Sequence, residues 1–142
     1  MAGTVLHVRD GQIVGDGSWV YAWLLPGTPR PVVYVGATGL DPALRTWLHL
    51  NHDDPEVGRV AARYPSSGGQ LDTPFDVLAF DVPVGALRSE VKTCLISRLS
   101  AENLLAPTYI GDPPVNHVET TAEQFVIDVV RAISRATDSR AT

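Results

Sequence analysis

Four side chains that can take part in chemistry lie close together in the sequence: Tyr21, Tyr34, Arg45 and His49. Arg45 and His49 are four positions apart, so a helix would place both of them on one side. The planar guanidinium of an arginine matches the oxygens of a phosphate, and a histidine can exchange a proton near neutral pH. The spacing therefore predicts a phosphate-binding site, provided that the tyrosines also reach it.

The two tyrosines belong to segments with the pattern of neighbouring strands. Tyr21 lies in the run SWVYAWLL and Tyr34 in PVVYVGAT, and the turn-rich residues between the runs predict an antiparallel hairpin. Both faces of the first run are apolar or aromatic, so we expect this strand to be central and covered on both sides. A suitable hairpin register would bring both tyrosines to one face, together with Trp19 and Trp23.

A helix is predicted directly after the hairpin. The dipeptide Asp-Pro at 41–42 is typical of an N-cap and a first helical residue. The apolar stripe of this helix would be formed by Leu44, Trp47 and Leu48. We therefore expect Trp47 to belong to the core, and Arg45 and His49 to lie on the flank of the stripe.

The rest of the chain predicts further helices around a third strand. The expected elements are a short strand at 4–8, a helical piece ending before Pro65, a strand at 75–82, an amphipathic helix at 85–100 and a last helix from 120 or 121 to 136. The inner face of the helix at 85–100 would hold Leu87, Val91, Cys94 and Leu95. A Thr-x-x-Glu capping box ending at Glu123 would start the last helix. This order predicts one α+β domain over 1–142, with a small antiparallel or mixed three-stranded sheet flanked by helices.

Composition limits the classes of protein to consider. The chain has 142 residues, of which 44% are hydrophobic and 19% are charged, and this suits one domain with a core. The formal net charge of −5 disfavours a tight nucleic-acid binder, although an active site can be locally basic. Cys94 is the only cysteine, so no intrachain disulfide can form and a cytoplasmic protein is expected. We expect no membrane association and no secretion signal, and the arginine-rich composition is typical of GC-rich bacterial genomes.

The two strand motifs resemble the signature tripeptides of the GIY-YIG nuclease superfamily. WVY at 19–21 and YVG at 34–36 correspond to the two tripeptides on consecutive strands. In that family the next helix carries an arginine, often followed one turn later by a histidine, and LRTWLH supplies Arg45 and His49 in these places. Trp19 stands where the family has its first glycine.

The later part of the resemblance concerns a glutamate and an asparagine. The segment SEVKTCLISRL offers Glu90 as the metal-binding glutamate of the family, with Glu102 as an alternative, and PPVN offers Asn116 as the closing asparagine. The resemblance covers about 18–116. An N-terminal extension and the expected C-terminal helix at 120–136 lie outside it.

The resemblance implies an endonuclease that hydrolyses a DNA phosphodiester bond with one Mg²⁺ or Mn²⁺ ion. Tyr21 would accept the proton of the attacking water as general base, and Tyr34 would support it through a hydrogen bond. Arg45 would bind the phosphate oxygens, and His49 is an alternative base or phosphate contact. Glu90 would hold the metal ion.

Two more residues and the partners follow from the same resemblance. Gly36 would let the backbone approach the substrate because it has no Cβ, and Asn116 would also contact the substrate. Structured or double-stranded DNA is the expected partner, and a protein partner or a homodimer is a further expectation. A free tyrosine has a pKa of about 10, so Tyr21 would need nearby positive charge to act as a base near neutrality.

Each of these residues also has a purely structural explanation. Tyrosines are common in half-buried strands, Arg45 can pair with Asp41, and Glu90 can pair with a basic neighbour on its own helix. Asn116 can cap a turn after Pro-Pro, and NHDDPE at 51–56 is more simply a polar loop than a metal site. A second class of function therefore stays open, namely a catalytically inactive GIY-YIG-like module that binds a protein or a nucleic acid.

Overall fold

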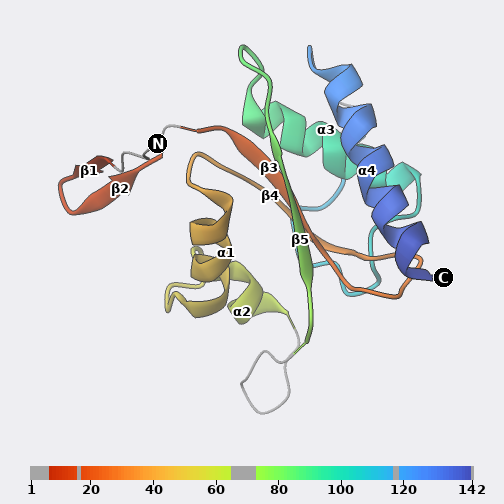
Figure 1. The fold of residues 1–142 in the computed structure, drawn as a ribbon, viewed down its shortest axis with the longest axis horizontal. Helices are drawn as coiled ribbons and strands as arrows, with labels where there is room; N and C mark the ends of the chain where they lie inside the picture. The colour runs from red at the N-terminus through yellow and green to blue at the C-terminus, as the bar shows by residue number, and fades with distance from the viewer. Residues whose placement is uncertain (1–6, 16, 65–72, 117–118, 142) are drawn as a thin grey trace, which may run out of the picture.

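The computed structural model describes residues 7–15, 17–64, 73–116 and 119–141. In these residues an antiparallel sheet of three strands forms the centre of the molecule, in the order β4-β3-β5 (Figure 1). The strands are β3 (Trp19–Leu24), β4 (Val32–Thr38) and β5 (Asp76–Asp81). The predicted α+β class, the hairpin and the central position of β3 are confirmed, and the sheet is antiparallel rather than mixed.

Helices cover both faces of this sheet (Figure 1). The helices α1 (Pro42–Asn51) and α2 (Arg59–Arg63) pack on one face, and α3 (Arg88–Ala101) and α4 (Glu123–Ala141) pack on the other. The alternation of side chains along β3 explains the two layers. Val20, Ala22 and Leu24 join the core under α3 and α4, whereas Tyr21 and Trp23 join the core under α1 and α2.

The start of α1 is confirmed, but its orientation differs from the expected one. Asp41 caps the helix by accepting a hydrogen bond from the backbone N–H of Ala43 at 2.9 Å, and Pro42 is the first helical residue. Trp47 is 58% exposed, so the prediction that it belongs to the core is wrong. The side chain of His49 points toward the sheet. Trp47 lies two positions earlier in the helix, so its side chain points away from the sheet.

The helices α3 and α4 also differ from the expected ones. Leu87 is 61% exposed and was wrongly placed on an inner face, because it is the N-cap residue that precedes the first turn of α3. The helix α4 begins at Glu123 and continues five residues past the expected end at 136. The carboxylate of Glu123 pairs with Arg98 of α3, and Thr120 accepts a hydrogen bond from the N–H of Ala122, so the reciprocal capping box is not formed.

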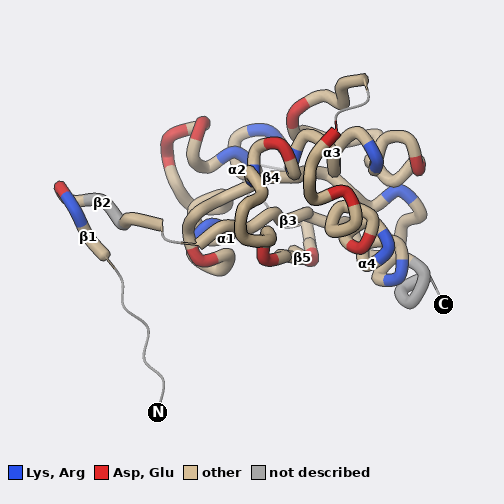
Figure 2. The backbone as a smooth tube through the Cα atoms, turned by 90° about the horizontal axis from the view of Figure 1, so that it is seen from above, with Lys and Arg blue, Asp and Glu red and all other residues tan. Residues whose placement is uncertain are grey.

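A small hairpin precedes the sheet. It consists of β1 (His7–Arg9) and β2 (Gln12–Val14), and it overlaps the strand expected at 4–8, of which 4–6 lie outside the described residues. The hairpin stands away from the rest of the molecule in both views (Figures 1 and 2). In the described part of the chain, no helix combines the length and the apolar character needed to cross a membrane.

Candidate functional site

A buried hydrogen bond joins Tyr21 of β3 to His49 of α1. The distance between Tyr21 Oη and His49 Nε2 is 2.6 Å, and the two residues are 3% and 0% exposed. The imidazole also contacts the rings of Tyr34 and Trp23, with centroid distances of 4.9 and 5.6 Å. His49 therefore occupies the centre of an aromatic cluster rather than the flank of α1.

The register of the hairpin explains how the Tyr21 hydroxyl reaches His49. Tyr21 lies opposite Gly36, and a Cβ atom at Gly36 would lie only 2.3 Å from Tyr21 Oη. The Tyr21 ring thus crosses β4 at the one position where no side chain is in the way. Tyr34 is opposite Trp23, so the two tyrosines share a face as predicted without being a directly opposed pair; their ring centroids are 6.2 Å apart.

Two arginines complete the group. Arg45 Nη1 donates to the carbonyl oxygen of Val57 at 2.8 Å, and its charge acts on the Tyr21 hydroxyl. Arg59 Nη1 donates to Tyr34 Oη at 3.2 Å. We call Tyr21, Tyr34, Arg45, His49 and Arg59 the arginine–tyrosine cluster. It brings together the four residues singled out at the start of the sequence, and it adds Arg59.

Sequence reasoning missed Arg59 and its neighbour Arg63, although a signal was present. The segment GRVAAR places these arginines four positions apart, which is the spacing that drew attention to Arg45 and His49. Figure 2 shows basic residues along α2, beside β4. A basic helix of this kind next to a candidate phosphate site is the pattern that would have identified them.

Burial and the arginines set the protonation states in the cluster. Burial, followed by the charges of Arg45, Arg59 and Arg63, lowers the pKa of His49 to about 3, so its imidazole is neutral at pH 7. Burial also raises the pKa of Tyr21 above its ordinary value, and the neighbouring Tyr34 adds to this effect. The positive charge of Arg45 and Arg59 works in the opposite direction but is outweighed. The free cluster therefore holds a neutral phenol against a neutral imidazole.

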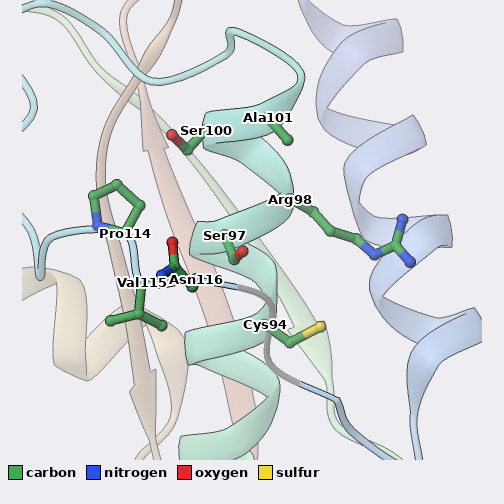
Figure 3. A pocket seen from close by; sticks show the side chains of 8 residues that line it. All are labelled: Cys94, Ser97, Arg98, Ser100, Ala101, Pro114, Val115 and Asn116. Atoms are coloured by element: carbon green, nitrogen blue, oxygen red, sulfur yellow. The ribbon is translucent and has the colours of Figure 1, made fainter.

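The other expected site residues lie elsewhere. Asn116 is exposed and lines a pocket of about 460 Å³ beside α3, where it faces Ser97, while Cys94 and Arg98 point toward α4 (Figure 3). Glu102 is the exposed C-cap of α3 and lines a separate pocket with residues of α4. Both positions belong to the side of the sheet covered by α3 and α4.

Glu90 does not join the cluster either. It is an exposed residue of the first turn of α3, seven positions before Ser97 and hence on the same side of that helix as the Asn116 pocket. Among the described residues, the groups that shift the pKa values of Tyr21 and His49 are tyrosines and arginines and include no carboxylate. Among the described residues, no three His, Cys, Asp or Glu side chains gather as they would to hold a metal ion. The residues at the cluster therefore do not fit the metal ion that the resemblance implies, and we assign no step of the reaction to one.

Comparisons of the chain with protein-family models, curated proteins and solved structures found no match. The function must therefore be argued from the geometry of the arginine–tyrosine cluster. That geometry combines two guanidinium groups, which bind anions, with a hydroxyl and an imidazole that share a proton.

Proposed function

We propose that this protein is an endonuclease of GIY-YIG type that hydrolyses a phosphodiester bond in DNA. The observation that carries the proposal is the 2.6 Å hydrogen bond between Tyr21 and His49, beside the Arg45 guanidinium. The placement of an anion-binding group next to a proton-sharing pair is what hydrolysis of a phosphodiester requires.

The roles of the residues follow from their contacts. Arg45 binds the non-bridging oxygens of the phosphate and stabilises the charge that develops on them. Tyr21 accepts a proton from the attacking water while its own proton passes to Nε2 of His49. The water oxygen forms a bond to phosphorus as the bond to the leaving sugar oxygen breaks. The leaving oxygen takes a proton from solvent, and His49 returns its proton to solvent. The relay allows Tyr21 to act without first becoming a free phenolate, which its raised pKa disfavours.

Substrate binding would prepare His49 to accept this proton. In the free protein burial and the charges of three arginines hold the pKa of His49 at about 3. A bound phosphodiester brings negative charge next to the same arginines, and it would offset their effect on the imidazole. The pKa of His49 should therefore rise when the substrate is in place.

A second candidate is a module that binds nucleic acid without cutting it. Two observations favour it: no carboxylate acts on Tyr21 or His49 among the described residues, and burial disfavours the charged forms of both. In this case the same arginines would bind phosphate, and the Tyr21–His49 hydrogen bond would only fix the position of α1 on the sheet.

A plasmid-nicking assay separates the two candidates. Supercoiled plasmid is incubated with the wild-type protein in Mg²⁺, in Mn²⁺ and in EDTA, and with the variants Tyr21→Phe, Arg45→Ala and Glu90→Gln. Arg131→Ala, which changes an exposed residue of α4, is the matched control. For an endonuclease we expect nicking by wild type and the control, and loss in Tyr21→Phe and Arg45→Ala.

The other results have definite meanings. Equal nicking by wild type, Tyr21→Phe and Arg45→Ala would reject the assignment of the site. Binding of DNA without nicking under every condition would support the non-catalytic module. Loss of nicking in Glu90→Gln and in EDTA would show that a metal ion takes part through a residue distant from the cluster.

A further inference from the structure

We propose that Arg59 and Tyr34 form a second phosphate subsite beside the one formed by Arg45 and Tyr21. The substrate would then be a nucleic-acid strand held at two neighbouring phosphates, rather than a single phosphodiester. This inference rests on the proposed function and adds to it a second point of contact with the strand.

Two arginines act on two neighbouring tyrosines, one through a hydrogen bond and the other through its charge. Arg59 Nη1 donates to Tyr34 Oη at 3.2 Å, and the charge of Arg45 acts on the hydroxyl of Tyr21. The rings of the two tyrosines are 6.2 Å apart and tilted by 32°, so the pairs are separate but adjacent on one face of the sheet. Successive phosphates of one strand are likewise adjacent anions of equal charge.

Both guanidinium groups are held in place by the same loop. Arg45 Nη1 donates to the carbonyl of Val57, and Arg59 Nε donates to the carbonyl of Glu56, each at 2.8 Å. A guanidinium has five N–H donors, so each arginine keeps donors for a ligand. Fixing the two groups before binding lowers the entropy that must be lost when the ligand is bound.

Charge and exposure at the second pair also suit an anion. The Arg59 side chain is 30% exposed, and its nearest carboxylate in the described part of the chain, that of Glu56, is 3.9 Å away and itself 73% exposed. Such a pair is weak and is easily replaced by a phosphate. Arg63 lies 3.6 Å from the same carboxylate but forms no hydrogen bond with either tyrosine of the cluster. Arg63 therefore offers a matched control for the loss of one positive charge.

The test compares ligands with one phosphate and with two. The thymidine dinucleotide TpT and the trinucleotide TpTpT are titrated into ¹⁵N-labelled full-length protein, without divalent metal, and dissociation constants are taken from the amide shifts. We expect wild type to bind TpTpT about tenfold more tightly than TpT, the effect of one further hydrogen bond to a charged group. Arg59→Ala should remove this difference, and it should weaken the binding of TpT only by the small factor that Arg63→Ala causes, because both variants lose one positive charge.

Controls make the result specific to the second subsite. Arg45→Ala should weaken the binding of both ligands, and Arg63→Ala should reduce both affinities by the same small factor. Arg59→Lys keeps the charge, and because an ammonium can still bind a phosphate it should retain part of the preference for TpTpT. The dispersion of the amide spectrum shows for each variant whether the fold is intact.

The binding results distinguish a failure of this inference from a failure of the proposed function. If wild type binds both ligands with one affinity, or if Arg59→Ala weakens both ligands equally, a second subsite does not exist, and phosphate recognition by Arg45 still stands. If wild type binds neither ligand and Arg45→Ala changes nothing, phosphate recognition itself fails, and the proposed function fails with it.

Discussion

The Tyr21 hydroxyl depends on the absence of a side chain at Gly36. In Gly36→Ala the new Cβ would lie 2.3 Å from Tyr21 Oη, so the ring must move and its hydrogen bond to His49 must lengthen or break. We expect the free energy of unfolding to fall by about 1–3 kcal/mol, as in other overpacked cores. Urea unfolding followed by circular dichroism measures this change.

Gly39→Ala is the control for this substitution. A Cβ at Gly39 would meet its nearest atoms at 3.4 Å, and these include the mobile end of Arg88, so the stability should change little. Equal stability of Gly36→Ala and Gly39→Ala would show that the Tyr21 ring does not cross β4 at this position.

His49 should make the stability of the protein depend on pH. Its pKa is about 3 in the folded protein and about 6.5 when unfolded, so between these values the unfolded chain binds the extra proton. The free energy of unfolding should therefore decrease as the pH falls from about 6.5 toward 3, by at most about 1.4 kcal/mol per pH unit from this residue. Urea titrations at a series of pH values measure the slope.

The contribution of His49 is isolated by comparing two variants. His49→Gln should have a shallower slope than wild type over this range, because it has no proton to gain on unfolding. His52→Gln, which changes an exposed histidine, is the matched control for the substitution itself. If His49→Gln and wild type give parallel curves, the imidazole is not held neutral by the fold.

At the scale of the element, α1 is positioned by its first turn. Asp41 accepts a hydrogen bond from the N–H of Ala43, and the N–H of Arg45 in turn bonds to the carbonyl of Asp41. Asp41→Ala should lower the free energy of unfolding by about 1 kcal/mol, the usual cost of losing an N-cap. Asp53→Ala, at an exposed position in the loop after α1, should have almost no effect. A loss of the same size in both variants would mean that the cap does not stabilise α1.

The same helix shows which structural features the sequence could predict and which it could not. The Asp-Pro start and the shared side of Arg45 and His49 follow from local rules, and both were predicted correctly. The rotation of α1 about its axis could not be predicted, because the apolar residues near Trp47 allow more than one orientation. The hydrogen bond to Tyr21 and the ring contacts of His49 decide it, and they depend on residues of other elements.

The β3–β4 hairpin is a similar case. Alternation allowed both tyrosines to lie on one face of the sheet if the hairpin register was suitable, and the structure has such a register. The pairing of Tyr21 with Gly36 depends on an irregularity between Trp23 and Leu24, where the register shifts. A register shift of this kind is set by packing along the whole strand and cannot be predicted reliably from the sequence.

At the scale of the whole molecule, the apolar character of the central strand β3 prevents the sequence from showing on which face of the sheet each helix packs. Both faces of β3 are apolar, so the pattern could not decide which helices cover which face. Glu90 was grouped with Tyr21 through the family resemblance, and the pattern of β3 could not show that α3 packs on the opposite face of the sheet. The arginine spacing in α2 was a sequence signal for Arg59, but its position beside Tyr34 depends on tertiary packing.

The β1–β2 hairpin is separate from the main sheet, so we expect that it can be removed without loss of stability. The hairpin forms a sheet of its own, and Val8 and Val14 are 56% and 44% exposed. Among the described residues, the buried clusters on both faces of the main sheet begin at β3. A two-stranded hairpin adds little stability by itself. Deletion of residues 1–14 should therefore change the free energy of unfolding by less than about 0.5 kcal/mol, as surface changes do.

Deletion of residues 129–142, a segment of the same length, is the matched control. It removes Val129, Val130 and Ile133 from the core under α3 and α4, so this variant should fail to fold cooperatively. Urea unfolding and a DNA-binding titration are measured on both deletions. A large loss of stability or of binding on removal of residues 1–14 would show that the hairpin packs on the body or on the substrate. In that case the arginine–tyrosine cluster would not be the whole of the functional surface.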